Sequence, residues 1–333
     1  MSTEILSIEA ARDLAQAALE ACNTASENAR VVAEALVRAE ADGQGGHGMS
    51  RVPSYAGQAR SGKVQGHAVP VLDDLKPGAF RVDAGHGFFY PAFQLALPEL
   101  TARAKANGVA ACAIHRSHHF GVAGHASEAL AERGCIGLIY GNAPKSLAPA
   151  GGTAPVLGTN PIAFAAPAPG APLVIDMAVT TVARGKILAA REAGEPIPEG
   201  WALGPDGQPT TDAAHALKGT LAPMGGSKGA AIALIIEVMS ACLAGSALSA
   251  EASSLFDPDG DAPNLGQTLI AIDAEALSGG AFAARMADLV GIYEGMEGVR
   301  LPGSRRLGAR ARADREGLVL KTVLLDQIRA LVT

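Results

Sequence analysis

Three side chains that could hold and protonate a small acid lie four residues apart in the sequence, at His47, Arg51 and Tyr55. If this segment is helical, that spacing places them on one face. The planar guanidinium of Arg51 matches a carboxylate in a bidentate way, the hydroxyl of Tyr55 can donate a hydrogen bond, and an imidazole such as His47 titrates near a pKa of about 6.5. The pattern therefore predicts a carboxylate-binding site with a proton donor. A solvated loop, with the arginine in a surface ion pair, is the alternative.

A second candidate is the segment His115-Arg116-Ser117-His118-His119-Phe120-Gly121, which directly follows an apolar run ending at Ile114. Open α/β sheets bind ligands at the carboxyl ends of their strands, so this segment is a candidate for binding or catalysis. Core or surface histidines are the ordinary alternative. A metal-dependent hydrolase is another, although no tight motif such as H-E-x-x-H supports it. Its ligands would come from Cys112, His115, His118, His119 and His125.

Two further segments could bind anions. Gly225-Gly226-Ser227-Lys228-Gly229 precedes a predicted helix, so free backbone N–H groups, the helix dipole and Lys228 favour a phosphate there, with an ordinary capped helix as the alternative. Near the C-terminus an arginine cluster could seat an extra phosphate, such as the 2′-phosphate that distinguishes NADP from NAD, although a run of charge is usually a solvated face. The cluster consists of Arg300, Arg305, Arg306, Arg310, Arg312 and Arg315.

The glycine-rich stretch 43–48 matches the dinucleotide-binding pattern G-x-G-x-x-G. That motif works only where a strand leads into the glycine turn and a helix follows it. Here a helical pattern precedes the turn and Pro53 follows closely. We therefore reject a Rossmann motif, and the sequence contains no phosphate loop of the G-x-x-x-x-G-K-[ST] type either.

The composition indicates a globular protein that binds a small molecule. The 333 residues include 27 Lys and Arg against 33 Asp and Glu, a net charge of −6, and few aromatic residues, so nucleic acid and membrane surfaces are disfavoured as partners. The four cysteines form no C-x-x-C pair, the N-terminus lacks a signal-peptide pattern, and Glu237 interrupts the apolar stretch 229–248. We therefore predict a cytoplasmic location.

The hydrophobic pattern predicts a helical N-terminal unit followed by an α/β region. Helices are expected over 7–21 and 26–41, capped by Ser7 and Ser26 and stopped at Gly43. From about residue 80, apolar runs alternate with helical patterns, which is typical of a sheet covered by helices. The expected strands are 109–114, 135–140, 161–166, 173–177 and 268–272, and the expected helices are 92–107, 124–133, 181–192, 229–248 and 281–291. A last helix over 317–331 could pack on the N-terminal unit, and 194–220 is expected to be a surface or active-site loop.

Taken in order, these segments resemble the malate/L-lactate/sulfolactate dehydrogenase family. These type-2 lactate/malate dehydrogenase-like oxidoreductases include ureidoglycolate dehydrogenase, diketogulonate reductase and the piperideine/pyrroline-2-carboxylate reductases. The motifs span most of the chain. They are His47-Gly48-x-x-Arg51-x-x-x-Tyr55, Ser117-x-His119-Phe120-Gly121, Gly158-Thr159-Asn160-Pro161, Asp176-Met177-Ala178, Gly185-Lys186, Gly226-x-Lys228-Gly229 and Pro302-Gly303.

The resemblance implies an oxidoreductase that reduces a 2-oxo or cyclic 2-imino acid with a nicotinamide cofactor, or runs the reverse oxidation. It implies that His47 donates the proton, with His119 as its rival, and that Arg51 and Thr159 bind the substrate, to which the side-chain chemistry adds Tyr55. The implied cofactor-binding residues are His119, Phe120, Gly121, Asp176, Met177, Ala178, Lys186, Lys228, Gly229, Gly303, Ser304, Arg305 and Arg306. A homodimer with the site near the subunit interface, and no metal, is also implied.

The sequence departs from the family pattern at three places. Gly46 stands where many relatives have a serine that orients the first histidine, and Val179-Thr180 replaces the usual Thr-Ser. Ser304, followed by two arginines, replaces an acidic residue. The loss of an acid and the gain of arginines favour NADP(H) over NAD(H).

We therefore predict an α/β fold with a non-Rossmann, mixed-sheet cofactor domain over residues 76–306. Both chain ends, residues 1–75 and 307–333, would form a helical lobe for substrate binding and dimerisation. The predicted activity is the interconversion of a small 2-oxo acid and a 2-hydroxy acid. The alternatives are a reductase of a cyclic 2-imino acid, the metal-dependent hydrolase, and a ligand-binding protein without catalytic activity.

Overall fold

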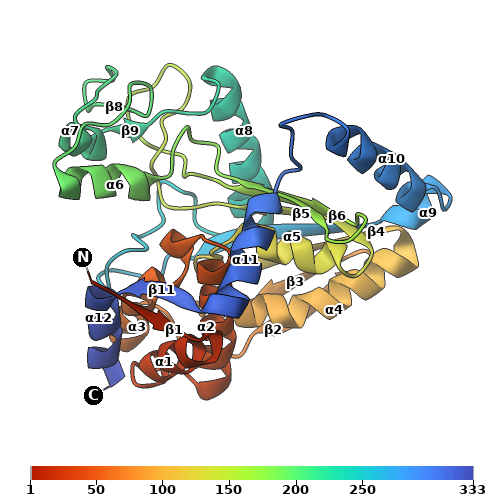
Figure 1. Ribbon diagram of the computed structural model, residues 1–333, viewed down its shortest axis with the longest axis horizontal. Coiled ribbons are helices and arrows are strands. Elements are labelled where there is room, and N and C mark those ends of the chain that lie inside the picture. The colour runs from red at the N-terminus through yellow and green to blue at the C-terminus, as the bar shows by residue number, and fades with distance from the viewer. Residues whose placement is uncertain (1, 333) are drawn as a thin grey trace.

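A seven-stranded mixed sheet forms the centre of the computed structural model, which describes residues 2–332 (Figure 1). Its strand order is β2-β3-β4-β10-β5-β6-β7, and of these neighbouring pairs only β3 and β4 run parallel. The strands are β2 (Val71–Lys76), β3 (Ala79–Asp83), β4 (Val109–Ser117), β5 (Cys135–Gly141), β6 (Ile162–Ala166), β7 (Leu173–Met177) and β10 (Leu265–Asp273). Rossmann domains are built on mostly parallel strands, so the predicted non-Rossmann mixed sheet is confirmed.

The five predicted strands are all present, as β4, β5, β6, β7 and β10. Central strand β10 is buried on both faces over most of its length, which is why its sequence reads as a continuous apolar run. Strands β2 and β3 were not predicted. β2 is the exposed edge of the sheet and carries Asp73, Asp74 and Lys76, and charged residues on an edge strand protect it from pairing with other chains.

Helices cover both faces of this sheet (Figure 1). α4 (Phe89–Asn107) and α5 (Ala123–Ala131) pack on one face. Leu130 of α5 packs closely against Gly137 of β5, where a side chain would leave too little room. α8 (Ser227–Glu237) and the π-helical turn Val238–Cys242 pack on the other, where Ser240 lies against Gly266 of β10. The predicted helix 229–248 is therefore shorter than expected. Within residues 2–332, no helix is long and apolar enough to cross a membrane.

Both chain ends contribute to one helical lobe (Figure 1). It contains α1 (Ile8–Glu20), α2 (Ser26–Ala41), α3 (Val52–Ser61) and α12 (Thr322–Val332). Ser7 caps α1 as predicted, accepting a hydrogen bond from Ala10 N at 3.0 Å, whereas the cap of α2 is Ala25 and not Ser26. The predicted helix 317–331 begins instead as strand β11 (Leu318–Lys321), which pairs antiparallel with β1 (Thr3–Leu6) before α12 follows. As predicted, α12 packs on α1.

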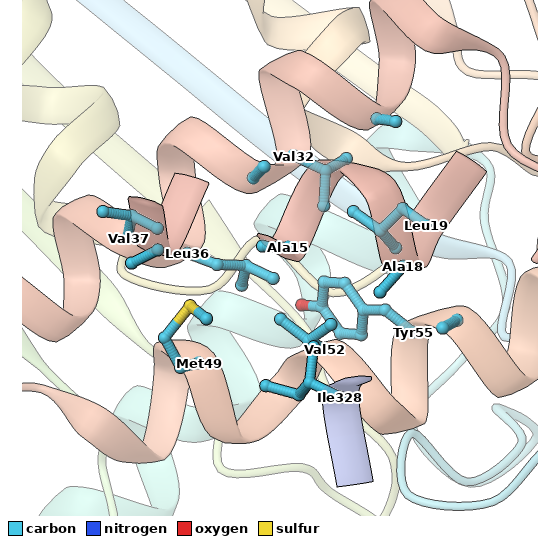
Figure 2. Close-up of a cluster of buried hydrophobic side chains, with 14 of the residues drawn as sticks. Ala15, Ala18, Leu19, Val32, Leu36, Val37, Met49, Val52, Tyr55 and Ile328 are labelled. Carbon is cyan, nitrogen blue, oxygen red and sulfur yellow. The ribbon is translucent and has the colours of Figure 1, made fainter. Parts of the chain in front are cut away.

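The core of this lobe is rich in alanine, which lets its helices approach closely (Figure 2). Leu19, Leu36 and Met49 are completely buried in it, and so is the ring of Tyr55. Residues from both chain ends share this core, since Leu325 and Ile328 of α12 belong to it. We propose on this basis that the described parts of 1–75 and 307–333, namely residues 2–75 and 307–332, form one lobe and residues 76–306 the other, although helix α11 (Ser304–Glu316) crosses that boundary.

The stretch 194–220 is more ordered than a loop. It contains a short hairpin of β8 (Ala202–Leu203) and β9 (Thr220–Leu221) and the helix α7 (Ala213–Lys218). Together with α6 (Arg184–Ala193), these elements enclose a small core of their own around Ile187 and Ile197. The stretch predicted as a surface or active-site loop therefore contains regular elements, and none of its residues lines the cavity described below. The remaining helices, α9 (Ala274–Ser278) and α10 (Phe282–Glu294), extend from the far end of the sheet.

A buried ionic network joins the helical lobe to α5. Glu128 of α5 binds Arg306 at 2.7 Å and Arg310 at 3.3 Å, both from α11, and Arg310 also binds Asp42 at 2.7 Å. Asp42 in turn accepts a hydrogen bond from His125 Nε2 at 3.0 Å. The side chains of Asp42 and Glu128 are almost completely buried. Arg306 and Arg310, two members of the arginine cluster identified in the sequence, therefore belong to an internal network. Their spacing of four residues places both on one face of α11.

Replacing Glu128 with alanine is expected to destabilise the fold strongly. Removing one partner of a buried ion pair leaves the other charge uncompensated, which costs roughly 3 to 5 kcal/mol. Arg306 would keep only Asp42, at 3.9 Å. The matched control is Glu34→Ala, because Glu34 forms an exposed pair with Arg30 at 2.7 Å and such pairs contribute about 0 to 1 kcal/mol. Urea unfolding measures both variants, and equal free energies of unfolding would contradict the expectation.

Candidate active site

A cavity of about 500 Å³ lies between the helical lobe and the sheet. Its walls come from the turn after α2, the segment after β4, the end of β7, the start of α6 and the loop near residue 255. The residues that line it are Gln44, Gly46, His47, Arg51, His119, Phe120, Gly121, Val122, Ala143, Pro144, Lys145, Ser146, Thr159, Pro161, Asp176, Met177, Ala178, Ala183, Arg184, Gly185, Ser254, Leu255 and Phe256.

The structure brings many of the sequence-predicted residues to this cavity. They are His47, Arg51, His119, Phe120, Gly121, Thr159, Asp176, Met177 and Ala178. Other predicted residues lie outside its walls: Tyr55, Lys186, Lys228, Gly229, Gly303, Ser304, Arg305 and Arg306. The first group comes from both lobes, so the cavity is a composite of the two.

The segment that carries His47 and Arg51 is not one helix. Two short 3₁₀ turns, Gly45–His47 and Met49–Arg51, precede α3. Glu40 of α2 fixes them, because its carboxylate accepts a hydrogen bond from Met49 N at 2.8 Å and occupies the space where a side chain at Gly48 would lie. The turns aim His47 and Arg51 into the cavity. The expectation that Tyr55 would share their face depended on a continuous helix, and Tyr55 is fully buried in the core instead.

Arg51 is held so that its fork faces the cavity. Its Nε donates to the carbonyl of Gly46 at 2.8 Å, and the ring of Phe256 covers its guanidinium at 4.8 Å. In residues 2–332 no carboxylate pairs with this guanidinium. Arginine binds carboxylates through two parallel hydrogen bonds. Arg51 is therefore available to bind an acid that enters the cavity.

Two histidines stand beside this arginine. The rings of His47 and His119 stack with centroids 5.3 Å apart. Burial, followed by the charge of Arg51, lowers the pKa of His47 to about 4; the same two causes hold the pKa of His119 well below its usual value. Both imidazoles are therefore neutral at pH 7 without a ligand. A carboxylate on Arg51 would offset that charge and raise both pKa values.

The two rings differ in what holds them. His119 Nδ1 lies 2.6 Å from the hydroxyl of Tyr55. The Nδ1 atom of His47 is buried and, within the described chain, has no hydrogen-bond partner. Gly46, which has no side chain, stands next to it, and within residues 2–332 no other group bonds this nitrogen.

The opposite wall has the features of a cofactor cradle. Asp176, at the end of β7, accepts a hydrogen bond from Gly124 N at 2.8 Å. Gly121 has a positive φ of 62°, and a side chain there would collide with the hydroxyl of Tyr90. Only glycine fits such a position, so the backbone itself forms the wall. The carboxylate of Asp176 and the bare backbone at Gly121 fit a dinucleotide, whose ribose hydroxyls need acceptors and whose phosphates approach the backbone closely.

The glycine turns at 225–229 and 303 lie next to β7 but outside the cavity wall. Met224 N donates to Val179 O at 3.0 Å, which places the start of α8 beside the end of β7. A side chain at Gly303 would lie 2.8 Å from Val174 O, which places the start of α11 at the same strand. Arg306 is only 8% exposed and is bound to Glu128, whereas Arg305 is exposed. Of these two arginines, only Arg305 is open to a ligand.

Sequence reasoning missed the loop that closes the cavity, which carries Leu255 and Phe256. Lys63 of the helical lobe holds this loop through hydrogen bonds to the carbonyls of Asp257 and Asp259 at 3.1 and 2.6 Å. Lys145 and Arg184, which add positive charge to the cavity, were missed as well. No local pattern marks these residues, because long-range contacts alone bring them to the site.

The five residues of the alternative metal site do not converge. Cys112 is buried in the hydrophobic core of the sheet, and burial raises the pKa of its thiol. His118 bonds Gln58, His119 bonds Tyr55 and His125 bonds Asp42. Within residues 2–332, no group of three or more His, Cys, Asp or Glu side chains could hold a metal ion. The hydrolase alternative therefore has no ligand set in this structure.

A neutral imidazole pair, an available guanidinium and a glycine-walled cradle in one cavity define an enzyme that acts on a small acid. The family model of malate/L-lactate dehydrogenase matches residues 6–329. The chain belongs to this family and is an oxidoreductase.

Similar proteins cover nearly the whole chain. A (2R)-3-sulfolactate dehydrogenase (NADP(+)) from Chromohalobacter salexigens is 44% identical over 332 residues, 98% of either chain. A Delta(1)-pyrroline-2-carboxylate reductase from Ancylobacter novellus is 40% identical and covers 98% of this chain and 97% of its own. Among solved structures, a delta1-piperideine-2-carboxylate reductase from Pseudomonas syringae has a TM-score of 0.93 at 37% identity, covering 99% of this chain and 100% of its own. These relatives confirm both the family and the fold.

Proposed function

We propose that this chain is an NADP(H)-dependent oxidoreductase that interconverts a small 2-oxo acid and the corresponding 2-hydroxy acid. The observation that carries the proposal is the available fork of Arg51 beside the stacked rings of His47 and His119. The fork would bind the carboxylate and so hold the neighbouring C2 atom next to the imidazoles. The names of the sulfolactate and imino-acid relatives support the reaction class, and the name of the sulfolactate relative supports the cofactor.

The chemistry requires a proton donor at the C2 substituent. A reduced nicotinamide, when bound, supplies a hydride to C2. The resulting negative charge on the C2 oxygen must then receive one proton to give the hydroxy acid. A positioned donor contributes about 10² to 10⁴ in rate, and either His47 or His119 can reach the cavity for this purpose. The acid's own carboxylate, bound to Arg51, raises the pKa values of both histidines and so favours their protonated forms.

Reduction of a cyclic 2-imino acid is the second candidate, because Arg51 would hold that carboxylate in the same way. The positive charge of Lys145 and Arg184 in the cavity favours the first candidate. A 2-oxo acid with a second anionic group, such as oxaloacetate or sulfopyruvate, would gain from those cations, whereas a protonated cyclic imine would be repelled.

An assay panel tests the function. The loss of reduced-nicotinamide absorbance would be followed with pyruvate, oxaloacetate, sulfopyruvate, pyrroline-2-carboxylate and piperideine-2-carboxylate. We expect the largest kcat/KM with an oxo acid that carries two anionic groups. Preference for a cyclic imino acid would establish the second candidate, and turnover of none of the five would overturn both.

The preference for NADP(H) is expected to depend on Arg305. This side chain is exposed at the start of α11, where the helix dipole also favours a phosphate. Arg305→Ala is expected to raise the KM for NADPH by about 10-fold to 100-fold, since a hydrogen bond to a charged group contributes about 1.5 to 3 kcal/mol. The KM for NADH should stay within about twofold. Arg312→Ala, an exposed arginine two turns further along the same helix, is the control, and equal effects on both cofactors would refute the assignment.

We further propose a cytoplasmic homodimer. Free cysteines, three of them buried, suit a reducing compartment. α8 and its π-helical extension expose Leu234, Ile235 and Leu243, and α10 exposes Leu289 and Ile292. Large apolar side chains grouped on a surface are typical of a protein interface. Sedimentation equilibrium would measure the mass in solution, for which we expect twice that of the chain.

A further inference from the structure

Two tyrosines lie behind His119, on the side away from the cavity. Tyr55 of α3 is fully buried, and its ring packs against Phe88 at 5.5 Å and His118 at 4.9 Å. Its hydroxyl lies 2.6 Å from His119 Nδ1. Tyr90 of α4 lies next to Tyr55, near enough for each phenol to shift the pKa of the other. The helical lobe and α4 thus each place one phenol behind the imidazole of His119. We call this row of Tyr90 and Tyr55 the phenol chain.

The space for this chain is built into the cavity wall. The hydroxyl of Tyr90 lies where a side chain at Gly121 would be, so the bare backbone at Gly121 serves the tyrosine as well as the cavity. Figure 2 shows the Tyr55 ring enclosed by apolar side chains such as Val52, with its oxygen as the polar end. Tyr55 is fully buried and cannot turn toward solvent, so its hydroxyl must satisfy its hydrogen bonds within the protein.

The protons of such a chain can point in only two ways. In the first, Tyr90 donates to Tyr55 and Tyr55 donates to His119 Nδ1. In the second, His119 Nδ1 carries the imidazole proton and donates it to Tyr55, and Tyr55 donates to Tyr90. Burial raises the pKa of Tyr55 to about 12, so this phenol keeps its proton, and the contact with Tyr90 lowers that pKa while raising the pKa of Tyr90. The hydroxyl of Tyr55 lies 2.6 Å from His119 Nδ1, and a fully buried O–H group is expected to donate to an acceptor at that distance. The first arrangement therefore agrees with the structure.

We propose that Tyr55 and Tyr90 are positioning residues that fix His119 as the Nε2–H tautomer, with that N–H directed to the C2 oxygen or nitrogen of the substrate. The inference rests on the proposed function for the identity of the substrate. The tautomer itself is a property of the protein alone. In a neutral imidazole one nitrogen donates and the other accepts, so the partner of one nitrogen determines the role of the other.

The two cavity histidines then have different freedom. His119 is fixed by the phenol chain, whereas the buried Nδ1 of His47 has no partner in the described residues and does not select a tautomer. The arrangement assigns to His119 the hydrogen bond that orients the substrate at C2. It also explains why Tyr55 carries a polar atom in a core formed otherwise by apolar side chains.

The direct test is the ¹⁵N NMR spectrum of the protein labelled at its eight histidines, with the His119 signals assigned by their loss in His119→Gln. We expect Nδ1 of His119 to show the shift of an acceptor nitrogen and Nε2 that of an N–H. Tyr55→Phe keeps the ring and its packing, and should give intermediate shifts because both tautomers become populated. An N–H signal at Nδ1 in the unsubstituted protein would overturn the proposal, whether or not any acid is turned over.

Kinetics supply a second readout. Loss of a partner that orients a functional histidine costs about 10-fold to 100-fold, and we expect this in kcat for Tyr55→Phe, with KM for the acid within about threefold because Tyr55 does not line the cavity. Tyr90→Phe, one bond further away, should show a smaller loss. Since glutamine has no tautomers, Tyr55→Phe should have less than about a twofold effect in a His119→Gln background.

Tyr140→Phe is the matched control, because Tyr140 lies on β5 outside this chain; it should retain the unsubstituted kcat. An unchanged kcat in Tyr55→Phe, or an equal loss with and without His119, would show that the tyrosine is merely structural. If Tyr55→Phe does not fold, the spectrum and kcat of Tyr90→Phe decide between the same outcomes.

Discussion

Arg51→Ala is expected to lower kcat/KM for the accepted acid by about 10³-fold while leaving the fold intact. Two charge-assisted hydrogen bonds to a carboxylate contribute roughly 4 kcal/mol together, which corresponds to this factor. Most of the loss should be in KM, with a further loss in kcat because the acid would no longer be held against the histidines. The fold should survive, since the only hydrogen bond of the side chain within the described residues is to the carbonyl of Gly46.

Steady-state kinetics and thermal unfolding measure this variant. Arg51→Lys keeps the charge without the planar fork, so we expect an intermediate loss of about 10²-fold. Arg60→Ala, an exposed arginine on α3, is the matched control and should resemble the unsubstituted protein. Kinetics within threefold of normal in Arg51→Ala would show that the carboxylate is bound elsewhere.

Loss of the proton-donating histidine is expected to lower kcat by about 10² to 10⁴. His47→Gln and His119→Gln should be compared with the same acid, because glutamine keeps an N–H group near the position of Nε2 but cannot transfer a proton. The larger loss identifies the donor, and full kcat in both variants would exclude both residues.

The same histidines give the reaction a pH dependence of known sign. Burial, followed by the charge of Arg51, lowers the pKa of His47 to about 4 and that of His119 well below its usual value. At pH 7 both histidines of the free enzyme are therefore neutral and lack the imidazolium proton, and reduction must take one proton up when the acid binds to Arg51. We expect kcat/KM for reduction to fall as pH rises. Titration calorimetry of the ternary complex in buffers of different ionisation enthalpy would measure the uptake, and no buffer dependence would contradict the coupling.

Local signals in the sequence were sufficient for much of the architecture. The runs that became β4, β5, β6, β7 and β10 were recognised because buried strands are apolar throughout, and Ser7 was recognised as a cap because its partner lies only three residues away. The motifs around His47, Arg51 and His119 were also recognised from local sequence, and the structure brings these three to one cavity. The rejection of the 43–48 glycine pattern was correct, since 3₁₀ turns and no strand surround it.

Other features were decided by contacts between distant residues. The sequence alone specified which side chains carry charge, aromatic rings and turn-forming glycines, because these are chemical properties of single residues and their near neighbours. Only the tertiary structure determined that Arg306 is buried against Glu128 rather than open to a phosphate, and that the hydroxyl of Tyr55 contacts His119 in the core rather than lining the cavity. These pairs are separated by 178 and 64 residues. Their contacts depend on how the helices pack on the sheet, and no local pattern records that packing.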